Sequence, residues 1–377
     1  MTHRAEIWKR AENLIYTFYG DNPDIQIVNR FLSEKKDLLH YGVAEYFDEL
    51  AEICWESLGK YNEKLISKNT VSCCFTAYLL GASEINPLPP HYYCEACKRV
   101  EWADNADCIF DMRGTRTCEC GATMRADGYN LPYETYIPYA QKLKTKDPVP
   151  ESYKDLFEAL TKKHFQWSLL GAAQAVNLLG QATGVRPEEI DLSDREVKYR
   201  LLGGDFSCMN PKLAEFLKQA YMIVQPSNHD ELLKLIGMAH GTQVWKNNAE
   251  NWLLNGECKL SEIPATRDEL YMDLRLDTII YHQYDKGLAL DVTDKARKGY
   301  YFEHGMNDYT AEILRKLCYD EWFIDYLLSV RYLSTKALSV MELKHIILLT
   351  WYQTYYPKQY AEAVMGNENI WEGGESS

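Results

Sequence analysis

Two closely spaced cysteine pairs constrain this chain more than any other feature of its sequence. The first pair is Cys94 and Cys97, separated by two residues, and the second is Cys118 and Cys120, separated by one. Two such pairs around a polar insert are typical of a tetrahedral zinc site in a knuckle or ribbon, because each short turn brings two sulfurs together. Gly121 can adopt the positive φ that such a turn often requires. The pattern predicts a structural Zn²⁺ site; the alternative is a metal-free loop whose cysteines pack as small apolar residues.

The composition argues against several classes of protein. The chain has 41 Lys and Arg against 55 Asp and Glu, a net charge of −14, so bulk charge does not favour strong binding to duplex DNA. No run reaches the roughly 18 apolar residues of a membrane helix, and no signal-peptide pattern is present, so we expect no membrane association. The eleven cysteines do not form a disulfide framework. We therefore expect a cytoplasmic protein.

Apolar residues recur at helical spacing through most of the chain. They predict two or three helices over residues 4–59 and one within residues 64–83. Beyond the cysteine region the same pattern predicts helices over 153–160, 166–183, 194–202, 211–224, 228–238, 267–280, 310–317, 321–334 and 336–365. Ser227 or Asp230 is the expected N-cap of the helix over 228–238.

The cysteine region also carries longer motifs. Residues 86–98 read NPLPPHYYCEACK, residues 118–121 read CECG and residues 127–135 read DGYNLPYET. Together they resemble the zinc segment of the PolC-type replicative DNA polymerase III α subunit of low-GC Gram-positive bacteria. The resemblance covers most of residues 10–365, and its other long segments are KNTVSCCFTAYLLGASEI before the zinc segment and residues 232–270 and 314–339 in the fingers.

The resemblance implies a truncated palm base, a zinc segment and helical fingers. We expect five parts along the chain: a helical, palm-like region at 1–85, a zinc-binding segment at 86–135, a linker at 136–151, a helical fingers-like domain at 152–365 and a disordered tail at 366–377. The predicted fold class is mainly α, with a small zinc-ribbon or knuckle insertion and few strands, and is α+β overall.

One departure from the family decides the expected function. PolC-type polymerases carry two palm aspartates in an Asp-x-Asp strand soon after the segment that residues 127–135 match. Two-metal nucleotidyl transfer needs such carboxylates to hold Mg²⁺. Here residues 133–139 are followed at 140–157 by AQKLKTKDPVPESYKDLF, which has no Asp-x-Asp. The resemblance thus implies that the catalytic part of the palm is missing, so we expect no catalytic residue and no bound Mg²⁺.

Four cations remain where the resemblance implies contacts with nucleotide or DNA. Lys68 stands in a turn where the family has Arg. Arg297 and Lys298 keep the Arg-Lys-Gly of a basic fingers loop, and Lys336 keeps the lysine of another fingers motif. We expect residual binding at these four positions.

The second cysteine pair also departs from the family, which has two residues between its cysteines. Thr117 stands at the first family position, and Cys118 lies one residue closer to Cys120. Cys118 remains a ligand if the turn re-forms around it, and Cys108 is the alternative. The other expected ligands are Cys94, Cys97 and Cys120.

Three functions are consistent with these departures. The first is a PolC-like pseudoenzyme that binds or regulates in DNA replication, on a mobile element for example, with replisome proteins or primer–template or single-stranded DNA as partners. The acidity of the chain favours protein contacts over tight DNA binding. The second is one part of a split DNA-directed DNA polymerase that is inert alone. The third is a decayed polymerase fragment whose remaining activity is structural zinc binding.

Overall fold

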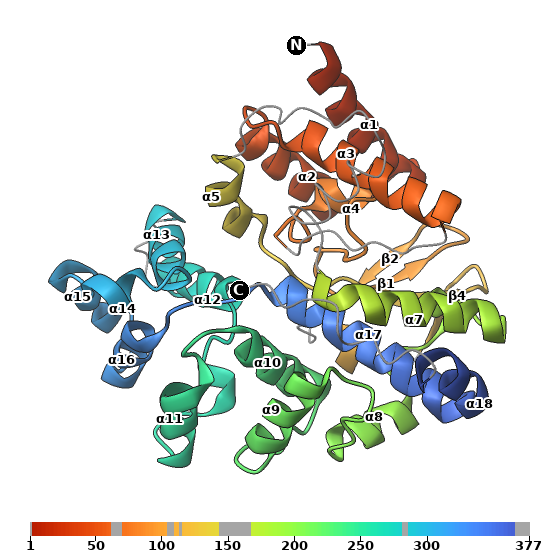
Figure 1. Ribbon diagram of the computed structural model, residues 1–377. Helices are drawn as coiled ribbons and strands as arrows, with labels where there is room; N and C mark the ends of the chain where they lie inside the picture. The colour runs from red at the N-terminus through yellow and green to blue at the C-terminus, as the bar shows by residue number, and fades with distance from the viewer. Residues whose placement is uncertain are drawn as a thin grey trace. The chain divides into compact units, whose positions relative to one another are not determined.

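The computed structural model describes residues 2–61, 70–103, 109–112, 115–142, 167–280 and 286–365. Within these ranges the chain is mainly helical and has a small four-stranded antiparallel sheet, which confirms the predicted fold class (Figure 1). The chain forms two compact units, residues 1–197 with 344–377 and residues 198–343. The predicted helix over 153–160, the tail at 366–377 and most of the linker lie outside the described residues.

Three helices open the first unit: α1 (Thr2–Tyr19), α2 (Ile25–Leu38) and α3 (Val43–Glu56). Each turns an apolar stripe inward, and Trp8, Phe31 and Phe47 are fully buried. The Asp24 carboxylate accepts the Gln26 N–H at 2.8 Å and so caps the start of α2. The helices predicted over residues 4–59 are confirmed.

A short helix, α4 (Phe75–Leu80), joins these helices to the sheet. Its first two amides, those of Phe75 and Thr76, donate to the carboxylate of Glu34 on α2 at 2.8 Å each. Glu34 thus satisfies two of the N–H groups that a helix start leaves without an intrahelical partner. The helix ends at Gly81, which adopts a left-handed φ of 85°.

The sheet has the strand order β2-β1-β4-β3. β1 (His91–Cys94) pairs antiparallel with both β2 (Val100–Trp102) and β4 (Thr123–Asp127), and β3 (Arg116–Thr117) pairs with β4. Cys94 lies opposite Met124 in the register of β1 and β4. Each outer strand is therefore joined to its inner neighbour by a turn that contains one cysteine pair.

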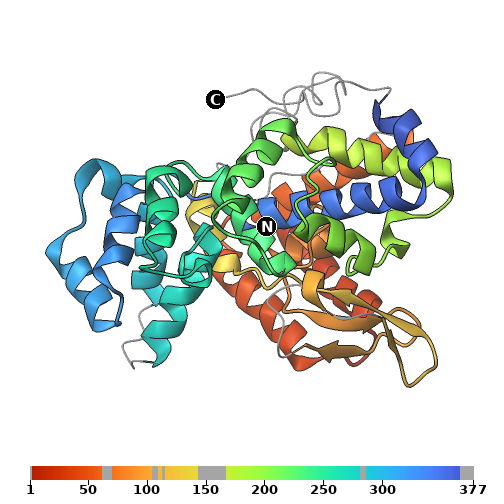
Figure 2. The same cartoon turned by 90° about the horizontal axis from the view of Figure 1, so that it is seen from below.

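The first unit is completed by segments from distant parts of the chain. They are α5 (Ile137–Ala140), α7 (Trp167–Thr183), the last part of α17 (Lys336–Tyr355) and α18 (Pro357–Tyr360). α7 runs beside the end of α17 in Figures 1 and 2, and the Tyr352 hydroxyl donates to the Val185 carbonyl at 2.7 Å. α5 places helical structure at the start of the segment expected to be a linker.

The second unit is built almost wholly from helices. They are α9 (Pro211–Tyr221), α10 (His229–His240), α11 (Glu250–Leu254), α12 (Arg267–Ile280), α13 (Lys286–Ala296), α14 (Tyr300–His304), α15 (Asp308–Lys316) and α16 (Glu321–Ser329), while α8 (Arg195–Leu202) and α17 cross from one unit to the other. No helix in the described ranges has both the length and the apolar character needed to cross a membrane.

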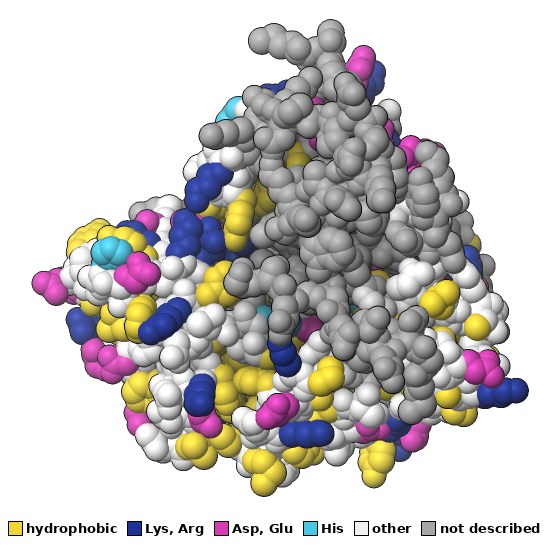
Figure 3. Space-filling model, in the orientation of Figure 1, with side chains coloured by type: hydrophobic (Ala, Val, Ile, Leu, Met, Phe, Trp, Pro, Cys, Tyr) yellow, Lys and Arg dark blue, Asp and Glu magenta, His cyan; other side chains and the backbone are white. Residues whose placement is uncertain are grey.

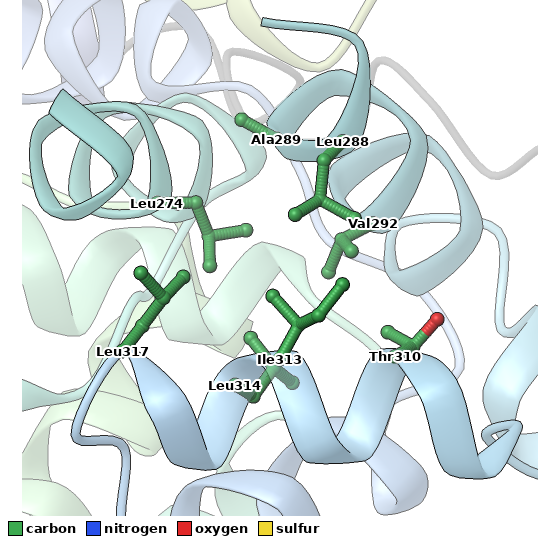
Figure 4. Close-up of a pocket in the computed structure, with 8 residues that line it drawn as sticks. All are labelled: Leu274, Leu288, Ala289, Val292, Thr310, Ile313, Leu314 and Leu317. Atoms are coloured by element: carbon green, nitrogen blue, oxygen red, sulfur yellow. The ribbon is translucent and has the colours of Figure 1, made fainter. Parts of the chain in front are cut away.

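The core of the second unit includes an apolar contact of three helices. Side chains from α12, α13 and α15 point toward one another around a small pocket in Figure 4. They are Leu274, Leu288, Ala289, Val292, Thr310, Ile313, Leu314 and Leu317. The helical spacing of these residues in the sequence is thus explained by burial.

The predicted N-cap of α10 is wrong. Asn228 occupies this position, and its side-chain oxygen accepts the Glu231 N–H at 2.8 Å. The Glu231 carboxylate accepts the Ser227 N–H at 2.7 Å and its hydroxyl at 3.0 Å. Ser227 therefore supports the helix start from one residue before the N-cap. Asp230 lies inside the first turn, where its carboxylate interacts favourably with the helix dipole.

Candidate metal centre

The two cysteine pairs lie in two similar turns of the small sheet. In the first turn, the Cys94 N–H bonds to Arg99 O at 2.9 Å and the Lys98 N–H bonds to Cys94 O at 2.8 Å. In the second, the Cys118 N–H bonds to Ala122 O and the Gly121 N–H bonds to Cys118 O, both at 2.8 Å. Each turn contains one residue in left-handed conformation, Lys98 in the first and Gly121 in the second. The positive φ expected of Gly121 is confirmed at 86°.

The turns bring four sulfurs together. The ligand atoms of Cys94, Cys97, Cys118 and Cys120 all lie within 4.8 Å of one another. Across the pairs, the Sγ–Sγ distance is 3.6 Å between Cys94 and Cys120 and 3.4 Å between Cys97 and Cys118. Four thiolates about 2.3 Å from a tetrahedral Zn²⁺ lie about 3.8 Å apart. The cluster is therefore of the right size to hold a metal ion.

The donor set favours zinc in a structural role. Four sulfur ligands fill the tetrahedral positions of Zn²⁺, which leaves none open for water or substrate. Cys94 and Cys118 are buried, whereas Cys97 and Cys120 are exposed. The centre therefore lies at the ends of the strands and is open to solvent on one side. The Cys97 N–H donates to the Cys94 thiol and is the main cause that lowers the pKa of Cys94 to about 7. A lowered thiol pKa favours the thiolate, which is the form that binds metal. The pKa values of Cys97 and Cys118 are raised instead, by the Cys94 thiol in the first case and by burial and the Cys97 thiol in the second, so the cluster favours one thiolate, at Cys94.

The structure brings Cys118 into the cluster in spite of the short spacer. The second turn closes one residue earlier than the first, so Cys118 takes the place that Cys94 has in the first turn, and Cys120 takes that of Cys97. The alternative ligand, Cys108, lies outside the described residues. The assignment of the four cysteines as zinc ligands remains a prediction that this geometry supports.

The arginines of the sheet are matched by carboxylates. Arg116 also lies over the Tyr92 ring, with its guanidinium carbon 4.3 Å from the ring centroid. The ion pairs are Arg99 with Glu119 and Glu101, Arg116 with Glu101, and Arg125 with Glu95. These exposed pairs contribute little stability, but they neutralise the guanidinium groups. Sequence reasoning missed this set, although alternating Arg and Glu between residues 95 and 125 is a visible signal for it.

Three of the four cations expected to contact nucleotide or DNA lie in the described part of the chain, all of them in the second unit. Arg297 is buried and pairs with Asp294 at 2.5 Å, and Lys298 pairs with the same carboxylate. Lys336 is buried at the start of α17, where its N–H donates to Asp268 at 2.7 Å. Lys68 lies outside the described residues. On the face in Figure 3, Lys and Arg are interspersed with Asp and Glu over the described part.

Comparisons with known proteins agree with the motifs. No family model matches the chain. The chain is 23% identical to the DNA polymerase III PolC-type of Thermotoga petrophila, over 96% of the chain and 34% of that protein. It is 23% identical to the protein of the same name from Thermotoga maritima, over 92% of the chain and 34% of the protein. It is 20% identical to the DNA polymerase III PolC-type of Clostridium perfringens, over 94% of the chain and 32% of that protein.

The alignment with a relative is longer than the chain itself. The Thermotoga petrophila alignment extends over 486 positions, whereas the whole chain has 377 residues. More than 100 aligned positions therefore have no counterpart in this chain. The chain also spans about a third of the length of the curated relatives it matches. The resemblance seen in the motifs is thereby confirmed: nearly the whole chain is homologous to about a third of a PolC-type DNA polymerase III.

Proposed function

We propose that this chain is a non-catalytic homologue of PolC-type DNA polymerase III that binds a component of the replication machinery. One observation carries the proposal: the alignment with a relative contains more than 100 positions that this chain lacks. We infer that the loss falls within residues 136–166, where the sequence has no Asp-x-Asp after the zinc segment. Without these carboxylates the two Mg²⁺ ions of nucleotidyl transfer have no ligands.

The charges of the described residues favour a protein partner over bare DNA. Binding to phosphate depends on Lys and Arg side chains that displace counterions from the nucleic acid. In this chain, with a net charge of −14, carboxylates outnumber these cations. Arg297 and Lys298 share Asp294, and the sheet arginines face glutamates. We therefore propose a replisome protein as the first partner, with primer–template or single-stranded DNA as the second.

The proposed role of the cysteine cluster is structural. One Zn²⁺ held by Cys94, Cys97, Cys118 and Cys120 would join the two turns of the sheet, and the chain's own residues would carry the binding function. None of the ten described cysteines forms a disulfide. They are in keeping with a reducing compartment, so we propose the cytoplasm as the location.

A primer-extension assay tests the loss of catalysis. Purified protein with primer–template, Mg²⁺ and all four dNTPs is expected to extend no primer above the background without protein, because the carboxylates for the two metal ions are missing. A bacterial DNA polymerase in the same mixture is the positive control. Steady incorporation by the purified chain alone would contradict the proposal.

The same alignment also supports a second candidate, one part of a split DNA polymerase. The missing positions could be supplied by another polypeptide that carries the Asp-x-Asp strand. Extension would then be absent with this chain alone and would appear on addition of that polypeptide. Co-purification from the native host distinguishes the two candidates, because a split enzyme is expected to bring this polypeptide with it in a one-to-one complex.

A further inference from the structure

The last turn of α1 lies against the strand that leads into the first cysteine turn. The Tyr93 hydroxyl donates to the Phe18 carbonyl at 2.5 Å. The rings of Tyr93 and Tyr19 meet edge to face, with their centroids 5.7 Å apart. The last four carbonyls of a helix have no partner within the helix, so Tyr93 satisfies one that α1 leaves open. Tyr93 directly precedes Cys94 in β1, so this contact holds the strand immediately before the first cysteine turn.

A second contact joins the residue that ends α1 to the cysteine turn itself. Gly20 has a φ of 78°, and its N–H bonds to the Tyr16 carbonyl at 2.9 Å. A Cβ atom at Gly20 would lie only 3.2 Å from the Cβ of Lys98. Lys98 is the left-handed residue of the turn, with a φ of 64°. A lysine keeps this unfavourable conformation only where its surroundings impose it.

We infer that metal binding by the cysteine cluster is coupled to the packing of the end of α1 against the first cysteine turn. A metal bound to Cys94 and Cys97 would hold the turn closed and thereby fix Lys98, against which Gly20 packs. Without the metal, the left-handed Lys98 loses the constraint that maintains it, and α1 loses the surface beneath its last turn. The inference rests on the proposed zinc site. Coupling is reciprocal, so a change at Gly20 must alter the retention of zinc.

Hydrogen exchange measures the first half of this coupling. The full chain is loaded with Zn²⁺, its zinc content is determined, and amide exchange is followed by mass spectrometry before and after chelation. Amides at the end of α1, near Tyr16 to Gly20, are expected to exchange faster after chelation, whereas α9 in the second unit keeps its rate. Unchanged exchange at the end of α1 would overturn the inference. Failure to bind zinc at all would instead overturn the proposed metal site.

A matched pair of glycine substitutions measures the other half. Gly20→Ala and Gly184→Ala each place a Cβ at a helix end with positive φ, 78° and 72° respectively. A Cβ at Gly184 meets no atom within 4 Å, so this variant has the backbone strain without the contact. Gly20→Ala is expected to speed zinc transfer to a chromogenic chelator roughly fivefold or more, and Gly184→Ala to leave it within about twofold of wild type. Equal rates for the two variants would overturn the coupling.

Discussion

Replacement of Cys94 by serine is expected to abolish zinc binding and to destabilise the first unit by several kcal/mol. Cys94 is buried, and its Sγ lies 3.6 Å from that of Cys120. Structural zinc contributes an apparent binding free energy of about 10–16 kcal/mol in zinc-finger peptides, and this binding energy is also folding energy. The sheet has four short strands and cannot bury much apolar surface. Its stability is therefore expected to depend on the metal more strongly than the stability of the helices does.

Elemental analysis and urea denaturation measure the two effects. Wild-type protein is expected to contain one zinc per chain, and its unfolding midpoint is expected to fall on addition of a strong chelator. Cys94→Ser should contain no zinc and should not respond to the chelator. Cys318→Ser is the matched control, because Cys318 is an exposed free thiol in the second unit. A zinc-free wild type, or equal zinc in both variants, would show that the cluster is not a metal site.

The cluster itself could be predicted because its information is local. Two cysteine pairs in short turns fix how far apart the sulfurs of each pair can lie, and the antiparallel pairing of β1 with β4 then brings the two turns together. The helices were predictable for a similar reason, because burial of one face leaves a periodic signal in the sequence. The prediction over residues 267–280 agrees with α12 at both ends.

Other features depend on residues far apart in the chain. Lys98 lies beside Gly20 at the end of α1, a contact between distant parts of the chain that no local pattern indicates. The backbone N–H of Lys336 donates to Asp268 on another helix, whereas Arg297 and Lys298 pair with Asp294, which lies only one helical turn earlier in the sequence. A motif preserves the residue type, whereas the availability of its charge depends on the carboxylates that lie beside it.

Glu34→Ala is expected to destabilise the protein by about 3–5 kcal/mol, because it leaves buried hydrogen-bond donors without an acceptor. Glu34 is fully buried, accepts the Phe75 and Thr76 amides at 2.8 Å and lies 3.6 Å from the guanidinium of Arg30. Arg30 also donates to the carbonyls of Cys73 and Leu131 at 2.7 and 2.8 Å. The substitution therefore leaves two buried amides without an acceptor and removes the carboxyl group beside the guanidinium. Lys36→Ala, at an exposed position of the same helix, is the control for helix propensity.

The pH dependence of this cost separates the carboxyl group from simple packing. Burial raises the pKa of Glu34 above its ordinary value of 4.5, although Arg30 and the Thr76 and Phe75 groups oppose the shift. The folded chain thus keeps the proton at pH values where the unfolded chain has lost it. The contribution of Glu34 is complete below pH 4.5 and declines as the pH rises through the folded-state value. Urea denaturation is therefore expected to show a larger cost for Glu34→Ala at about pH 5 than at about pH 8. The same cost at both pH values would mean that the substitution acts through lost packing, because a cavity has no proton to release.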